Sequence, residues 1–184
     1  KRFDGVFRSS NMQTRIDDAD PAVVNSVIRV YMRKRFVPTL GVEARYVLNF
    51  SSPIYTSSST EQVIESTLFT YRGFQCHLRD YIDIDNERKI KIVRGTGAQE
   101  IDVEKDVGTI DEANGTVVLS AFAPEAIVGE YIEVEVSPDS NDLAPKRNEL
   151  LTILVDDLEI TGEVDTMITG GTAAGIEYTT FSRH

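Results

Sequence analysis

Apolar and polar residues alternate along much of the chain, which is the pattern of β-strands that bury one face. In residues 27–36, for example, Ile28, Val30 and Met32 alternate with charged and aromatic residues. Similar short runs are bounded by turn-forming residues and occupy positions 45–50, 67–71, 74–79, 88–94, 107–110, 116–122, 131–136 and 150–155. This spacing predicts eight to ten short strands.

Two dipeptides predict tight hairpins between neighbouring runs. Arg72-Gly73 separates the run at 67–71 from the run that follows it. Asn114-Gly115 predicts a type I′ turn, because both residues tolerate the positive φ angles that this turn needs. Hairpins of this kind indicate a largely antiparallel sheet.

The predicted fold class is mainly β, as an antiparallel sandwich or a strongly curled sheet with one or two short helical turns. The helical turns are expected at 124–127 and 146–150, and an α+β fold is the alternative. Residues 1–20 are polar and are expected to form an irregular lead-in segment or linker. A β-rich domain is expected over 21–169, followed by a flexible, glycine-containing C-terminal tail over 170–184.

The net charge of the chain and the length of its apolar runs limit which partners it can bind. The formal net charge of this 184-residue chain is −11, which disfavours nonspecific binding to nucleic acid or to an anionic membrane. No apolar run approaches the roughly 20 residues that span a bilayer. We therefore expect neither nucleic acid nor membrane as a partner.

Candidate catalytic and metal-binding groups are few. Cys76 and His77 are adjacent, but neighbours on a strand point to opposite faces, so a buried structural cysteine and a surface histidine are expected. Residues 80–87 are rich in oxygen ligands but lack the glycine and the terminal glutamate of a calcium loop. We predict no catalytic residues, no metal site, no cofactor and no enzyme activity.

Charged side chains form two conspicuous groups. Glu100, Asp102, Glu104 and Asp106 share one strand face, which is expected to be a solvated outer face or, alternatively, an acidic strip that docks a basic partner. The basic cluster at 33–35 is expected to be either a solvated strand end or a contact site for an acidic surface such as a second copy of the chain.

Three stretches taken together carry a resemblance to a known family. They are residues 20–26 with 33–38, residues 108–111 with 114–119, and the proline-bracketed tract at 138–142 with 145–153. In their order and spacing, with the tail at 172–180, they resemble the C-terminal region of the large baseplate wedge proteins of T-even-type contractile-tailed phages, which are relatives of the baseplate J family.

The resemblance implies a structural virion protein with no catalytic residues to assign. It implies association of copies through C-terminal regions into a homodimer or ring, which with other baseplate wedge proteins forms the inner ring of the tail baseplate after assembly in the host cytoplasm. We predict that the subunit interface includes Arg33, Lys34, Arg35, Asp139, Asn141, Asp142, Lys146 and Arg147. A carbohydrate- or surface-binding β-sandwich is the alternative, and a hydrolase that uses His77 is a third possibility.

Overall fold

The computed structural model describes residues 6–55, 62–144, 152–153 and 158–162. The chain divides into two units, Lys1–Leu151 and Thr152–His184, and all the regular structure described below belongs to the first. Its elements are α1 (Ser9–Asp17), β1 (Met32–Phe36), β2 (Ala44–Asn49), β3 (Ile64–Ser66), β4 (Phe69–Tyr71), β5 (Phe74–Ile82), β6 (Arg88–Arg94), a 3-10 turn (Gly97–Gln99), β7 (Ile101–Asp111), β8 (Thr116–Phe122), β9 (Ala126–Ile127) and β10 (Ile132–Val136).

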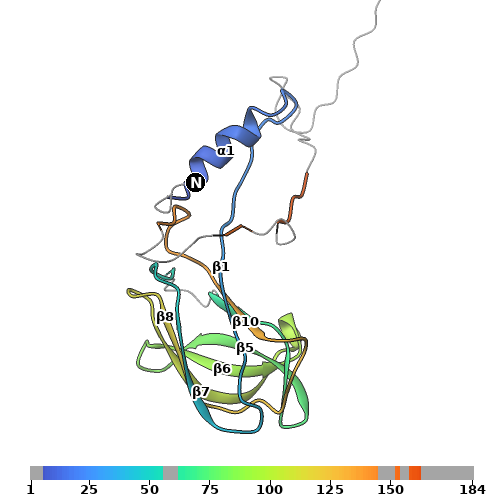
Figure 1. The fold of residues 1–184 in the computed structure, drawn as a ribbon, viewed down its shortest axis with the longest axis vertical. Helices are drawn as coiled ribbons and strands as arrows, with labels where there is room; N and C mark the ends of the chain where they lie inside the picture. Colours follow the sequence, from blue (N-terminus) through green and yellow to red (C-terminus); the bar gives the residue numbers. More distant parts are fainter. Residues whose placement is uncertain (1–5, 56–61, 145–151, 154–157, 163–184) are drawn as a thin grey trace, which may run out of the picture. The chain divides into compact units, whose positions relative to one another are not determined.

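The described strands form one ten-stranded antiparallel sheet with the order β1-β10-β3-β5-β6-β7-β8-β2, and β4 pairs with β5 and β9. The sheet curls into a nearly closed barrel (Figure 1). The mainly β prediction is therefore confirmed, in its curled-sheet form, with one short helix and one 3-10 turn.

The inner face of the curled sheet holds the core, and the predicted alternation places residues there correctly. In β10, Ile132, Val134 and Val136 are buried, while the two intervening glutamates face outward. The same alternation contributes apolar side chains from β5, β6 and β8 to a single core cluster. Burying each large aliphatic side chain stabilises the fold by about 1.5–3 kcal/mol, so this cluster is the main source of stability.

Aromatic side chains fill the space between the two edge strands of the sheet. The rings of Phe36 on β1 and Tyr46 on β2 have centroids 4.9 Å apart, and both rings lie near Phe122. The Tyr46 hydroxyl also accepts a hydrogen bond from the backbone N–H of Thr39 at 2.9 Å. These contacts join β1 to β2 through side chains where no backbone ladder between them is described.

One ion pair lies inside the barrel. Asp80 on β5 is 3% exposed and pairs with Arg88 on β6, whose Nε also donates to Glu112 at 2.8 Å. The second oxygen of Asp80 accepts hydrogen bonds from the backbone N–H groups of Val63 and Ile64, both at 2.9 Å. This carboxylate therefore connects the start of β3 to β5 and β6.

Two expected turns differ from the prediction. The Asn114-Gly115 pair does not form a type I′ turn, because residues 112–115 make a four-residue loop in which only Gly115 has a positive φ, at 64°. The carboxylate of Asp111 accepts hydrogen bonds from both the backbone and the side chain of Asn114, which holds that residue in the loop. Residues 124–127 contain the short strand β9 rather than a helical turn, because Ala126 and Ile127 pair with β4.

The first segments of the chain also differ. The expected strand at 27–36 begins only at Met32, and the expected irregular segment at 1–20 contains α1. Asp142, more than a hundred residues away in sequence, accepts a hydrogen bond from the N–H of Ser9 at the start of this helix. Of the runs expected at 146–150 and 150–155, the structure describes only residues 152–153, which have no regular structure.

The internal ion pair leads to a prediction about stability. Replacing Arg88 with Met would leave the Asp80 carboxylate buried without its cation, and we expect a loss of about 3–5 kcal/mol in the free energy of unfolding. Adding Asp80→Asn should recover part of that loss, since the amide oxygen can still accept from Val63 and Ile64. Urea denaturation of the two variants measures both values.

The matched control is Lys91→Met, which removes the partly exposed Lys91–Asp102 pair on the outer face. We expect it to cost no more than about 1 kcal/mol. A loss for Arg88→Met as small as that of the control would show that the internal pair does not organise the fold.

Candidate interaction surfaces

The outer face of the sheet carries a stripe of paired charges that begins at the predicted basic cluster. Arg33 and Arg35 on β1 lie opposite Glu135 and Glu133 on β10 in the strand register. The Nε of Arg33 is 2.6 Å from a Glu135 carboxylate oxygen, and the Nε of Arg35 is 2.5 Å from Glu133. The structure thus places both arginines in ion pairs within the chain.

The stripe continues across the next strands with like charges side by side. Glu65 on β3 lies directly opposite Glu135 on β10, and Arg79 on β5 lies opposite Lys91 on β6. Like charges in direct register are destabilising unless each has a partner of opposite sign. Here Arg79 is 3.0 Å from Glu65, and Lys91 is 2.7 Å from Asp102, so each strand compensates its neighbour.

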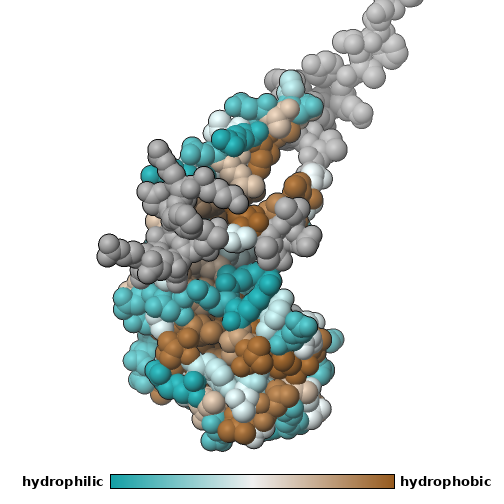
Figure 2. All heavy atoms as spheres, viewed as in Figure 1, coloured by the Kyte–Doolittle hydropathy of each residue, from teal (hydrophilic) through white to brown (hydrophobic). Residues whose placement is uncertain are grey.

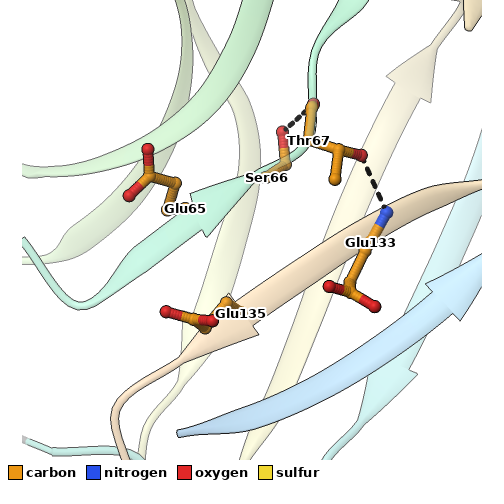
Figure 3. A pocket seen from close by; sticks show the side chains of 5 residues that line it. All are labelled: Glu65, Ser66, Thr67, Glu133 and Glu135. Carbon is orange, nitrogen blue, oxygen red and sulfur yellow. Dashed lines mark hydrogen bonds between the residues drawn. The ribbon is translucent and has the colours of Figure 1, made fainter. Parts of the chain in front are cut away.

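A shallow depression lies on this stripe between β3 and β10 (Figure 3). Its volume is about 180 Å³, and it is lined by Glu65, Ser66, Thr67, Glu133 and Glu135. The N–H of Glu133 donates to the Thr67 hydroxyl, which fixes one wall. An adjoining depression of about 240 Å³ reaches Arg79. Small-molecule pockets usually measure roughly 300–1,000 Å³, so these depressions match a partner side chain better than a drug-sized ligand.

The acidic residues of β7 contact basic residues and tyrosines from β4, β5, β6 and the turn after β4. Glu104 lies 2.6 Å from Arg72 and accepts a hydrogen bond from the Tyr71 hydroxyl, while Asp106 accepts one from Tyr81. Burial, together with the Glu104 contact, raises the pKa of Tyr71 to about 12. The pKa of Asp102 is lowered, chiefly by a hydrogen bond from Lys91. These acids are therefore engaged within the sheet rather than forming an uncompensated strip.

The proline-bracketed tract makes contacts within the chain. Asp142 accepts hydrogen bonds from the backbone and hydroxyl of Ser9, and Arg8 lies 3.3 Å from its carboxylate. Leu143 forms an isolated antiparallel bridge with Phe7. The predicted interface residues Asp139 and Asn141 contact segments of the same chain as well, through the carbonyl oxygens of Pro53 and Ile28. Lys146 and Arg147 lie outside the described residues.

Cys76 and His77 lie on opposite faces of β5, as predicted. Cys76 belongs to the core cluster, and burial raises the pKa of its thiol. His77, however, is not the surface residue that the alternation suggested, since it is only 3% exposed. It is covered on the outer face because Arg79 and Glu100 fold over it. Alternation identifies the face of a strand correctly but says nothing of what covers that face.

Exposed apolar side chains gather at one end of the barrel, and sequence reasoning did not single them out. The loop between β1 and β2 meets the segment before β9 through a hydrogen bond from Gly41 N–H to the Pro124 carbonyl. That segment meets β4 through a hydrogen bond from Glu125 N–H to the Thr70 carbonyl. We call the exposed apolar residues of the loop between β1 and β2, and those that flank β4 and β9, the apolar rim: Val37, Leu40, Val42, Leu68, Phe74 and Val128.

Brown, apolar surface is visible at the lower end of the barrel in Figure 2, where the loop between β1 and β2 lies in Figure 1. Val37 is 70% exposed, and Leu40 and Val42 are 48% and 54% exposed. Exposed apolar residues that lie close together mark interaction sites more often than scattered ones do. The missed signal is the run Val37, Leu40, Val42 within a turn segment, where polar residues are usual.

Comparisons with known proteins add no assignment: no family model, curated protein or solved structure matches this chain significantly. The described part of the chain has no helix with the length and apolar character needed to cross a membrane. Within those same residues, no group of three or more histidine, cysteine, aspartate or glutamate side chains is arranged to hold a metal ion.

The intrachain position of the basic cluster leads to a second prediction. Arg33→Glu would place a third acid beside Glu133 and Glu135, so we expect a loss of about 1 kcal/mol or slightly more in the free energy of unfolding. Salt screens exposed charges, so the loss should shrink at high ionic strength. Thermal unfolding at low and high salt measures it.

Arg29→Glu is the control, since it makes the same charge change at an exposed position for which no ion pair is described. It should change stability by less than Arg33→Glu. If Arg33→Glu left stability at the control value while it weakened association between copies, the cluster would be an intersubunit contact as the sequence suggested.

Proposed function

We propose that this chain is an assembly domain of a structural virion protein, of the kind found in the large wedge subunit of a contractile-tail baseplate. In this role copies associate with each other and with other wedge proteins in the inner baseplate ring. The resemblance of the ordered sequence stretches supports this proposal. The observation that carries it is the apolar rim, whose exposed side chains offer an apolar surface for docking.

The apolar rim suits a second copy of the chain better than the basic cluster does. Arg33 and Arg35 already pair with Glu135 and Glu133, so using them between subunits would first break contacts within one. Tight contacts need a desolvated centre, and charges around it mainly set the rate and register of docking. With a net charge of −11, two copies repel at long range, so an apolar contact must overcome that repulsion.

Salt distinguishes these two modes of association. Added salt screens repulsion between like-charged copies, so association through the apolar rim should strengthen as ionic strength rises. Association through ion pairs between the basic cluster and a neighbour's acids should weaken under the same change. Solution mass measured across a concentration series, at low and high salt, separates the two.

The third prediction concerns the apolar rim directly. The double substitution Leu40→Asp and Val42→Asp should shift the monomer–dimer equilibrium toward monomer by about tenfold or more, since two apolar contacts that together contribute at least about 1.4 kcal/mol would be lost. Analytical ultracentrifugation gives the equilibrium constant, and circular dichroism checks the fold.

Ile84→Asp is the matched control. Ile84 is fully exposed in the turn between β5 and β6, at the end of β5 remote from Phe74 and the apolar rim. It should leave association unchanged. Equal effects of the double variant and the control, or a chain that is monomeric at every concentration and salt tested, would contradict docking through the apolar rim. A thermal shift on adding glycans would instead favour the surface-binding alternative.

A further inference from the structure

His77 lies at the centre of a charged cluster that neither the fold nor the proposed assembly role explains. Its side chain is almost fully buried on the outer face of β5, opposite the fully buried Val93 of β6. Charged groups reach it from three elements: Glu65 from β3, Arg79 from β5 itself, and Glu100 from the segment just before β7. The next outward residue on β6, Lys91, pairs with Asp102.

The hydrogen bond between His77 and Arg79 is the contact that a neutral imidazole makes. The single N–H of Arg79 Nε is shared between His77 Nε2, at 3.2 Å, and Glu100 Oε1, at 3.1 Å. An arginine side chain stays protonated and has no acceptor atom, so His77 Nε2 must supply the lone pair. The imidazole is therefore neutral in this arrangement, with its proton on Nδ1.

Arg79 uses this position to join β3, β5 and the segment just before β7. Its Nη1 is 3.0 Å from a Glu65 oxygen on β3, and its Nε is 3.1 Å from Oε1 of Glu100. The same Glu100 oxygen is 3.5 Å from His77 Nε2. A protonated imidazole would compete with Arg79 for that oxygen and would bring a second cation against the guanidinium.

We propose that His77 is a pH-sensitive latch. As a neutral imidazole it accepts a hydrogen bond from Arg79 and holds the guanidinium between β3 and Glu100. On protonation, Nε2 becomes a donor, the imidazolium takes the Glu100 carboxylate, and Arg79 is displaced from the cluster. The strand that loosens is β3, which has three residues and a single registered pair with β5, between Glu65 and Arg79.

The direction of the pH effect follows from the surroundings of His77. Burial, and next the nearby Arg79, lower the pKa of His77, although Glu100 and Glu65 act in the opposite direction. A histidine whose pKa is lower in the folded than in the unfolded chain stabilises the fold fully above its ordinary value near 6.5, and that stability is lost as pH falls toward the folded pKa. Acidification below neutral pH should therefore open the latch.

Two measurements test the latch, and the first isolates His77. The chain has two histidines, so His184→Gln leaves His77 as the single imidazole to follow by NMR from about pH 8 to about pH 5. We expect its titration midpoint below the ordinary histidine value. A midpoint at or above that value overturns the proposal.

The second measurement compares wild type with His77→Gln, whose neutral amide oxygen can still accept from Arg79 at any pH. Hydrogen exchange of the amides in β3 should be the same in both proteins at about pH 7.5. At about pH 5, wild type should exchange faster, by up to about tenfold for each unit by which the His77 pKa lies below its ordinary value. Equal exchange at both pH values overturns the proposal.

A third variant tests the latch if His77→Gln does not fold. Arg79→Gln, made together with His184→Gln, removes the cation that the neutral imidazole holds, so the His77 midpoint should move upward. An unchanged midpoint would show that Arg79 and His77 do not act together. This latch is independent of the proposed assembly role, and its failure would leave that role untouched.

Discussion

The fold depends on one buried carboxylate. The two oxygens of Asp80 have different partners. One accepts hydrogen bonds from the N–H groups of Val63 and Ile64 at the start of β3, and the other pairs with Arg88. β3 pairs with β10 along its whole length but shares only one registered pair with β5, and β10 and β1 follow it in the sheet order. A pair buried this deeply contributes little net stability compared with an apolar core, but it penalises any arrangement that separates its members. Its main effect is therefore to specify where β3 lies.

On the outer face of the sheet, acidic and basic side chains compensate the repulsion between like charges on neighbouring strands. Two glutamates in register on β10 and β3, and two bases in register on β5 and β6, would each repel in isolation. Each pair of like charges becomes favourable only when an adjacent strand supplies side chains of opposite charge. This pattern ties the charges to the strand order, because exchanging two neighbouring strands would leave like charges unpaired. Single exposed pairs contribute little, so their value here is mainly in register and order.

Local patterns in the sequence predict the strands well, and tertiary contacts explain most of the errors. The run at 88–94 coincides with β6, and the Arg72-Gly73 hairpin forms with positive φ at both residues. By contrast, α1 depends on Asp142, and β9 depends on a pairing with β4, so neither is visible within a short window of sequence. The basic cluster is visible in the sequence as a run of three residues, but the partners of Arg33 and Arg35 on β10 lie about a hundred residues away. No pattern within a short stretch of sequence distinguishes a charged residue that pairs within its own chain from one that pairs with another chain.

These separate features meet on β5. The strand begins at Phe74 in the apolar rim, carries His77 and Arg79 on its outer face, and turns Asp80 into the core. Its side chains alternate between faces, so a slip of one residue would expose Asp80 and bury Arg79. Such a slip would break the internal pair and the outer cluster together, and β5 must therefore act as a rigid unit. A contact made at the apolar rim and a proton bound at His77 consequently act on the same strand, about 10 Å apart at 3.4 Å per residue. Because β5 cannot shift its register, neither docking at the apolar rim nor protonation of His77 can displace the other site by sliding the strand. The loosening of β3, which shares a single registered pair with β5, is the route by which the proposed latch would couple them.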